Sequence, residues 1–337
     1  MSGRRVPPVP QGAVMPMFAR WLMIAWLWPV LAPAAEPFPA SPVRILLPVT
    51  PGGATDFVAR LMQPGLHAAL GQPVVIENRP GAGGKIAVET AARATPDGYT
   101  MLFGNVGAMA INPSLFRSFP VDPVRDFVCL GVVADSTAVI VSHSSLPVKT
   151  LREFIDYARA RPGQINYGAA NPASPARLGM EVLARKAGID LVGVMYKGSG
   201  DVSIALLSGE VGIASASIPA VIANIKSGQL RALAIKSRTR SELLPEVPTF
   251  DELGFPELTI SSWQALYVPA RTPAARAKIL HDAIARVAAD PQIAEKAKPG
   301  GMSILKPGTA AECAEFTRAQ IRFWATVVKQ AGIAGSM

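Results

Sequence analysis

The sequence contains few of the residues that cross-link chains or bind metals, with 2 Cys and 3 His among 337 residues. Cys129 and Cys313 lie far apart and belong to no CxxC or Cys/His cluster, so the sequence indicates neither a zinc site nor a redox pair. We expect both to be small buried hydrophobic residues, with a long-range disulfide as the alternative. A chain of this length can bury a core without covalent cross-links.

Charged residues are also scarce, at 17%, and the formal net charge is +9. The Lys and Arg residues are scattered singly, and no basic run is interleaved with aromatic residues, so we do not expect a nucleic-acid partner. His67 and His281 fall within predicted helices, and no pair of histidines has metal-ligand spacing. No G-x-S-x-G motif is present. We therefore expect no catalytic residue, no metal and no cofactor.

The first 34 residues have the pattern of a secretory signal peptide. Three arginines precede the apolar run at 21–31, which is followed by small residues up to Ala34. This run is too short to span a bilayer, and no later run is long enough. We expect export to the periplasm with cleavage near Ala34, and translation starting at Met1, Met15 or Met17.

The rest of the chain alternates β-branched runs with amphipathic patterns, which predicts an α/β protein with mostly parallel sheets and helices on both faces. Two lobes suit the length, one formed by residues 35–137 plus 262–337 and the other by 138–261. The first helix is predicted over 56–70, and Pro64-Gly65 should kink or shorten it. The two C-terminal helices are predicted over 273–289 and 310–330.

Five predicted strands run into loops of small residues that open a helix. In an open α/β sheet such loops lie together at the carboxyl ends of the strands, where ligands bind. The residues of these loops are Thr50-Pro51-Gly52-Gly53-Ala54-Thr55, Gly104-Asn105-Val106-Gly107-Ala108, Gly168-Ala169-Ala170-Asn171, Lys197-Gly198-Ser199-Gly200 and Ser215-Ala216-Ser217.

Small residues let a ligand approach the backbone, and free N–H groups at the helix starts attract an anion. Each helix start favours an anion by about 0.3–1 kcal/mol, and by about 2 kcal/mol when partly buried. The alternative for any one loop is a simple tight connection. Asp56 falls in the first turn of its helix, where a purely structural role and ligand contact are both open.

Residues 81–87 match G-x-G-x-x-A after a predicted strand, as in dinucleotide-binding folds. No acidic residue closes the next predicted strand at 99–103, where a ribose ligand is expected. The match therefore does not support nucleotide binding.

Several motifs in this chain resemble those of the Bug-type periplasmic solute receptors of tripartite tricarboxylate transporters. They occur in family order across nearly the whole chain after residue 34. The motifs are PGGATDFVAR at 51–60, VIENRPGAGG at 75–84, PDGYT at 96–100, NPSL at 112–115, YKGSG at 196–200, LRALA at 230–234 and LPEVPT at 244–249.

The resemblance implies a two-lobed, type II periplasmic-binding-protein (Venus flytrap) fold that closes over a small carboxylate. It implies that the loops at 52–56 and 104–108 hold a carboxylate through backbone groups and bridging water. It also implies contributions from 169–174, which ends in Ser174, and from 197–200 and 215–217 of the other lobe.

Two positions depart from the family pattern. Many relatives carry Asp where this chain has Ala216, so an amino-acid ligand is disfavoured. Relatives often have His where Arg177 stands, and an Arg fork suits a second carboxylate. The alternatives for Arg177 are a solvated helix face or an ion pair with Glu181 at i, i+4.

Together these features predict a periplasmic, non-enzymatic, monomeric receptor for a small carboxylate ligand, partnered by membrane permease subunits. Two other functions stay open: a ligand sensor that docks on a membrane sensor protein, and a secreted hydrolase or isomerase. The hydrolase or isomerase would require a base in the cleft, and the predicted loops contain neither His nor Glu.

Overall fold

The computed structural model describes residues 3, 8, 37–170, 173–237, 239–260 and 262–337. The chain divides into two units, Met1–Phe38 and Pro39–Met337, and every helix and strand named below belongs to the second unit. The predicted signal peptide, residues 1–34, lies almost wholly outside the described residues.

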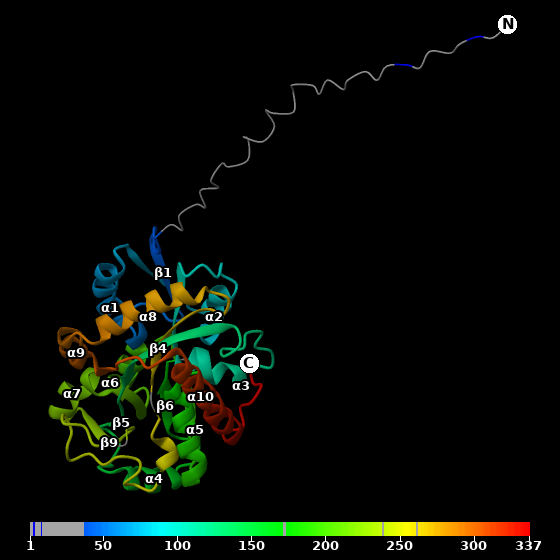
Figure 1. The fold of residues 1–337 in the computed structure, drawn as a ribbon. Helices are drawn as coiled ribbons and strands as arrows, with labels where there is room; N and C mark the ends of the chain where they lie inside the picture. The colour runs from blue at the N-terminus through cyan, green and yellow to red at the C-terminus, as the bar shows by residue number, and fades with distance from the viewer. Residues whose placement is uncertain (1–2, 4–7, 9–36, 171–172, 238, 261) are drawn as a thin grey trace. The chain divides into compact units, whose positions relative to one another are not determined.

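The second unit contains two sheets flanked by helices (Figure 1). The six-stranded sheet has the order β11-β4-β10-β3-β1-β2, and the five-stranded sheet has the order β7-β6-β8-β5-β9. The strands of the first sheet are β1 (Val43–Leu47), β2 (Val74–Asn78), β3 (Thr100–Asn105), β4 (Phe127–Ser136), β10 (Gln264–Pro269) and β11 (Met302–Ile304). Those of the second are β5 (Ala138–His143), β6 (Asn166–Ala169), β7 (Val192–Met195), β8 (Ile213–Ser217) and β9 (Leu230–Ile235).

The α/β class is confirmed, and both sheets are mixed, with parallel and antiparallel pairs. Among the described strands, β1 pairs parallel with β2 and β3, and β6 pairs parallel with β7 and β8. The strands β10 and β5 run antiparallel to the neighbours on either side of them. β11 also pairs antiparallel with β4. The two sheets thus share one order, in which three parallel strands are followed by an antiparallel strand that arrives from the other sheet's part of the chain.

The chain passes from one sheet to the other where β4 ends at Ser136 and β5 begins at Ala138. It returns between β9 and β10 through a segment that includes a 3₁₀ turn at Pro256–Leu258. β10 is buried along its whole length, which agrees with the mainly apolar sequence that follows Gln264. The strands of the six-stranded sheet thus come from two stretches of the chain, and those of the five-stranded sheet come from the single stretch between them.

The helices follow the strands closely, and most begin within two residues of the predicted positions. They are α1 (Ala54–Leu70), α2 (Lys85–Ala92), α3 (Asn112–Leu115), α4 (Leu151–Arg159), α5 (Pro175–Ala187), α6 (Ser199–Ser208), α7 (Ile218–Lys226), α8 (Ala274–Ala288), α9 (Pro291–Ala297) and α10 (Ala310–Gln330). A π-helical turn, Gly107–Ile111, precedes α3. No described helix is both long and apolar enough to cross a bilayer.

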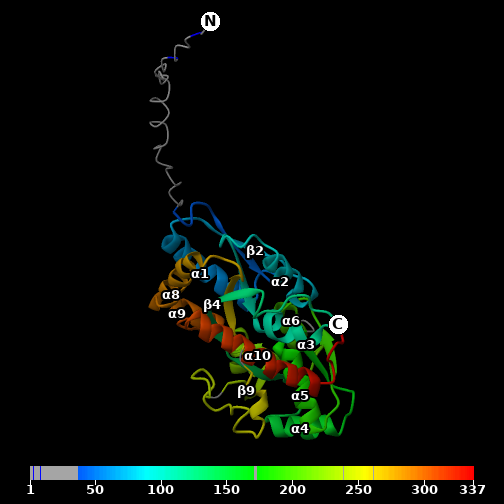
Figure 2. The same cartoon turned by 45° about the vertical axis from the view of Figure 1, so that its right-hand side comes forward.

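α1 continues through Pro64 to Leu70, so the expected shortening at Pro64-Gly65 was wrong. α1 packs against α8, as Figures 1 and 2 show. A Cβ atom at Gly65 would lie 3.0 Å from the side chain of Val287, so the absence of a side chain there allows close helix packing. This packing supports the helix across the missing Pro64 N–H donor.

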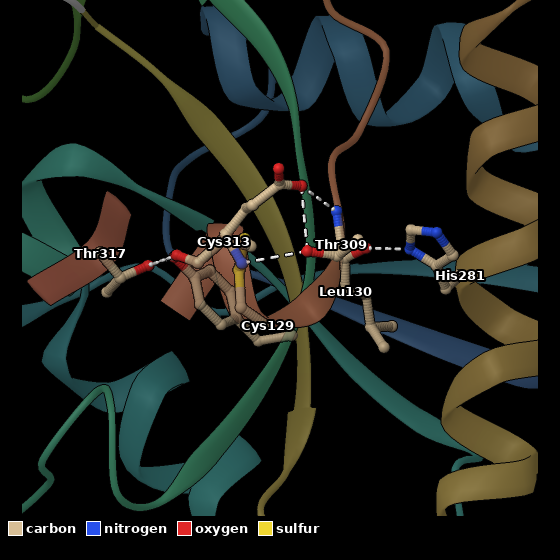
Figure 3. Close-up of a disulfide and its surroundings, with 8 residues drawn as sticks. Cys129, Leu130, His281, Thr309, Cys313 and Thr317 are labelled. Carbon is tan, nitrogen blue, oxygen red and sulfur yellow. Dashed lines mark hydrogen bonds between the residues drawn. A yellow bond between two sulfur atoms is a disulfide. The ribbon is translucent and has the colours of Figure 1, made fainter. Parts of the chain in front are cut away.

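Cys129 of β4 and Cys313 of α10 form a disulfide with their Cα atoms 5.7 Å apart (Figure 3). The expectation of two unlinked buried residues was wrong, because α10 packs directly on β4 although the cysteines are 184 positions apart. The start of α10 is fixed by a capping box, in which the Thr309 hydroxyl accepts from the Glu312 amide and the Glu312 carboxylate accepts from the Thr309 amide. On α8, His281 Nδ1 lies 2.7 Å from the Leu130 carbonyl oxygen of β4.

Removing the disulfide should destabilise the protein. The double variant with Cys129→Ala and Cys313→Ala should lower the free energy of unfolding by about 2–5 kcal/mol, because the cross-link restricts the unfolded chain over a long loop. Urea unfolding of the variant and of the wild type, with and without reductant, measures this. A wild-type free energy that reductant leaves unchanged, or two titratable thiols in the denatured oxidised protein, would contradict the assignment.

Candidate functional site

A cavity of about 470 Å³ lies where segments of both sheets meet, which is a size typical of small-molecule sites. The strand-end loops of the first sheet contribute Gly52, Gly53 and Ala54. From the second sheet come residues of three loops, with further residues from distant segments. The described lining is Gly52, Gly53, Ala54, Phe57, Ser136, Ala138, Ala169, Ala170, Ser174, Pro175, Ala176, Ser199, Gly200, Val202, Ser203, Ser215, Ala216, Ser217, Ala220, Lys236, Ile260, Ser262 and Gly300.

Four helices of the described chain begin at this cavity: α1, α5, α6 and α7. Each follows a strand directly, and the N-cap or first-turn residues of each line the space. The first amides of a helix have no acceptor within the helix, and its N-terminus carries partial positive charge. The cavity is therefore built to receive hydrogen-bond acceptors, and anions above all.

Hydroxyl groups add further donors around the same space. Ser174 is the N-cap of α5, and its Oγ accepts from the Arg177 amide at 3.2 Å, which leaves its own O–H free to donate. Ser217 is the N-cap of α7 and makes no side-chain capping bond. Such a hydroxyl can turn toward a ligand without breaking a helix cap.

Lys236 is the charged side chain among the described lining residues, and no Asp or Glu lines the cavity within that set. It directly follows β9 and is 4% exposed. Burial lowers the pKa of its ammonium group to about 8. The sequence analysis missed this residue, although one signal was available: a lysine placed directly after a buried apolar strand.

The predicted site residues divide into those that line the cavity and those that support it. Eight line it, namely Gly52, Gly53, Ala54, Ala169, Ala170, Ser174, Ala216 and Ser217. In the loop at 197–200, the residues on the cavity are Ser199 and Gly200, whereas Lys197 is exposed to solvent. A Cβ atom on Gly198 would lie 3.8 Å from Oγ1 of Thr50, so these two predicted residues are neighbours across the sheets. Asn171 lies outside the described residues.

Asp56 holds the first loop in shape. Its carboxylate accepts from the Gly52 amide at 3.0 Å, from Arg60 Nε at 2.9 Å and from Asn78 Nδ2 at 2.9 Å. Burial by itself would raise the pKa of Asp56, but the hydrogen bonds from Arg60, Gly52 and Asn78 outweigh it, so the pKa lies below its ordinary value. These contacts therefore support a structural role for Asp56, which was one of the two alternatives.

The second predicted loop of the six-stranded sheet also makes internal contacts. Asn105 donates from Nδ2 to Thr55 Oγ1 at 3.3 Å and accepts at Oδ1 from the Ala108 amide at 2.9 Å. The Val106 amide donates to the Trp263 carbonyl at 3.2 Å. A Cβ atom on Gly107 would lie 2.8 Å from the Ala173 carbonyl oxygen, so a glycine is required where this loop meets the other sheet's segment.

Arg177 of α5 takes part in a partly buried polar cluster with Glu181 and with Tyr167 of β6. Its Nε lies 3.8 Å from Glu181 Oε1, and the Tyr167 hydroxyl donates to the same oxygen at 2.6 Å. Burial and the neighbouring Glu181 raise the pKa of Tyr167 well above its ordinary value. Of the alternatives weighed for Arg177, the ion pair with Glu181 is the one present, and Arg177 is not among the described lining residues.

A second hollow, of about 690 Å³, lies between α5 and α10. Its lining is Val182, Arg185, Lys186, Thr326, Lys329 and Gln330. These residues lie in the later turns of both helices, where backbone carbonyls rather than amides are unsatisfied. In the described part of the chain, no group of three or more His, Cys, Asp or Glu side chains could hold a metal ion.

Comparisons with known proteins agree with this geometry. The family model described as "Tripartite tricarboxylate transporter family receptor" matches residues 58–333. Protein BugT of Bordetella pertussis (strain Tohama I) is 36% identical over 301 residues, which cover 89% of this chain and 92% of that protein.

Two solved structures share the fold over most of both chains. The periplasmic binding protein BugD has a TM-score of 0.80 and 29% identity, covering 88% of this chain and 99% of its own. Rpa4515 of R. palustris, solved with adipate, has a TM-score of 0.81 and 32% identity, with the same coverage of 88% and 99%. The resemblance found in the motifs is thereby confirmed, together with the two-lobed α/β fold.

The Asp56 contacts generate a pH-dependent prediction. Asp56→Asn should lower the free energy of unfolding at pH 7 by about 1–3 kcal/mol, because it removes charge-assisted hydrogen bonds at a buried site. The pKa of Asp56 is lowered in the folded protein, so its contribution is present above about pH 4 and is lost as pH falls through the lowered pKa. Urea unfolding at pH 7 and at pH 3 measures the difference.

Asp156→Asn is the matched control, since Asp156 pairs with Arg159 on the surface of α4 and is 64% exposed. It should change stability by less than about 1 kcal/mol. An Asp56→Asn effect that is the same at both pH values, or no larger than that of Asp156→Asn, would contradict the role assigned to Asp56.

Proposed function

The chain belongs to the tripartite tricarboxylate transporter receptor family, and we propose that it captures a small organic carboxylate between two lobes and delivers it to a membrane transporter. The family and the matched solved structures are those of solute-binding receptors and not of enzymes. The ligand class, the lobes and the site residues of this chain are the content of the proposal.

One observation carries the proposal: the cavity brings together four helix N-termini and one ammonium group, with no carboxylate among its described lining residues. A partly buried helix N-terminus favours an anion by up to about 2 kcal/mol. Several of them could supply a large part of the roughly −8 kcal/mol of a micromolar complex. A neutral solute would leave the charge of Lys236 without a counter-charge, and a cationic solute would be repelled by it.

In this proposal each lobe is built around one of the two sheets. Residues 35–137 plus 262–337 form one lobe, residues 138–261 form the other, and closure brings their strand-end loops onto the ligand. Residues 1–34 serve as a signal peptide for export to the periplasm. The disulfide between Cys129 and Cys313 suits that compartment, because disulfides persist in oxidising environments. We expect a monomer that docks on membrane permease subunits.

The related Rpa4515 was solved with adipate, an aliphatic acid, and this supports a small aliphatic acid as the ligand here. The apolar lining residues Phe57, Val202 and Ile260 suit the hydrocarbon part of such a ligand. The donors at the helix starts suit its carboxylate.

A carboxylate ligand should raise the melting temperature in a dose-dependent, saturable way. A ligand that binds only the folded state adds about 2.7 kcal/mol at one hundred times its Kd. The measurement is a thermal-shift screen of mono-, di- and tricarboxylic acids and aromatic acids, on protein shown by native mass spectrometry to hold no retained ligand. No shift with any acid in the screen would refute the proposed ligand class, and turnover of a bound acid would favour the hydrolase or isomerase alternative.

The role of the helix starts can be tested by removing a single amide. Ala54 is the first residue of α1, a position where proline is tolerated because its missing N–H has no acceptor within the helix. Gly53 before it has an extended backbone, with φ −83° and ψ 172°, which is the conformation that a residue before proline prefers. Ala54→Pro should weaken binding of the best acid from the screen about ten-fold, because one N–H donor to a charged acceptor is lost. Isothermal titration calorimetry measures the affinity.

Ala310→Pro is the matched control for this experiment. Ala310 is the exposed first residue of α10, after the extended cap Thr309, and it is not among the described lining residues. It should leave the affinity unchanged, and both variants should keep the wild-type melting temperature. Equal affinities of the two variants would remove the α1 amide from the site.

A further inference from the structure

Lys236 is buried, and among the described residues no carboxylate pairs with its ammonium group. Its Nζ donates to the Pro175 carbonyl oxygen at 3.2 Å, and no carboxylate of the described residues forms an ion pair with it. An ammonium group has three donors, and one carbonyl satisfies only one of them. Buried charges in proteins are normally paired, because leaving an ammonium group in a low-dielectric site is costly.

The surrounding backbone holds this lysine in place. The Lys236 amide donates to the Ala138 carbonyl at 2.8 Å, which extends the pairing of β9 with β5. A Cβ atom at Gly179 would lie 2.9 Å from Nζ, so the glycine on α5 makes room for the ammonium group. The side chain therefore has a defined position at the wall of the cavity, beside the first turn of α5.

The start of α1 and the ammonium group of Lys236, both of which favour an anion, come from different sheets. Gly53 and Ala54 follow β1 of the six-stranded sheet, whereas Lys236 follows β9 of the five-stranded sheet. A ligand with one carboxylate has a single anionic group to offer to these two positions. A short acid with a carboxylate at each end can satisfy both.

We propose that Lys236 determines specificity by binding the second carboxylate of a small dicarboxylic acid, whose first carboxylate lies at the start of α1. This inference rests on the proposed function and adds the ligand subclass and the residue that selects it. Lys236 thus has the role that the sequence analysis considered for Arg177, whose guanidinium group is engaged by Glu181.

The buried ammonium group of Lys236 destabilises the ligand-free protein, and a bound carboxylate would remove this effect. Burial lowers its pKa to about 8, which means that the site disfavours the charged form when no anion is present. A carboxylate beside Nζ favours that charged form. Replacing the ammonium group by an uncharged side chain of similar length should therefore stabilise the empty protein while weakening the dicarboxylate complex.

The test compares dicarboxylic and monocarboxylic acids of the same carbon number on the wild type and on two variants of Lys236. Calorimetric titrations use the pairs succinate and butyrate, glutarate and valerate, and adipate and hexanoate, with the wild type, Lys236→Met and Lys236→Arg. For at least one pair the wild type should bind the dicarboxylate about ten-fold or more tightly than its monocarboxylate. Lys236→Met should lose most of that preference, with the monocarboxylate affinity changed less than about two-fold, and Lys236→Arg should restore part of it.

Lys149→Met controls for the loss of one positive charge, because Lys149 is exposed at the start of α4 and lies outside the described cavity lining. It should leave the preference unchanged. The melting temperature of ligand-free Lys236→Met should equal or exceed that of the wild type, whereas a purely structural lysine would give a clear decrease. If Lys236→Met does not fold, Lys236→Gln takes its place, and the wild-type preference is measured in either case.

The outcomes separate the two proposals. If monocarboxylates bind as well as dicarboxylates, or if Lys236→Met weakens both acids of a pair equally, the role of Lys236 is overturned while the receptor function stands. If no acid of either kind binds to ligand-free wild type, the proposed ligand class itself is overturned. The inference is supported if Lys236→Met loses the preference for dicarboxylates while the wild type and Lys149→Met keep it.

Discussion

The cavity between the two sheets has an excess of positive charge, and no carboxylate of its described lining balances that charge. Helix N-termini from both sheets, together with the ammonium group of Lys236, face one space whose described lining contains no carboxylate. Water can solvate these groups in the open protein, but lobe closure would remove much of that water and leave the positive charge uncompensated. A bound anion supplies the missing charge, so ligand capture and lobe closure would stabilise each other.

Two carboxylates near this space, those of Asp56 and Glu181, are bound by partners inside the protein. Asp56 is held by Gly52, Arg60 and Asn78, and Glu181 is held by Arg177 and Tyr167. Each arrangement keeps a negative charge next to its own donors and away from the lining of the cavity. The same contacts shape the loops, since the Gly52 amide that binds Asp56 belongs to the segment at the cavity. Asp56 thus acts on the cavity through the backbone that it positions.

The mixed pairing of the sheets and the disulfide have a common origin. β4 and β10 lie side by side in the six-stranded sheet, and the chain between them forms the whole five-stranded sheet. α10 then packs on β4, which brings Cys313 to Cys129. The disulfide therefore joins the C-terminal helix to a strand from which the chain leaves for the other sheet, and it stabilises the frame on which the cavity is built.

Much of this protein could be predicted from the sequence, because the relevant signals are local. Hydrophobic periodicity located the main strands and helices, and the small residues at 52–54, 169–170 and 216–217 indicated which helix starts would line the cavity. The tertiary structure alone decided the rest. The antiparallel insertion of β5 and β10, the pairing of Cys129 with Cys313 and the presence of Lys236 in the cavity all depend on which distant segments meet. Spacing along one chain does not encode those contacts, since they arise only when segments far apart in the sequence pack together.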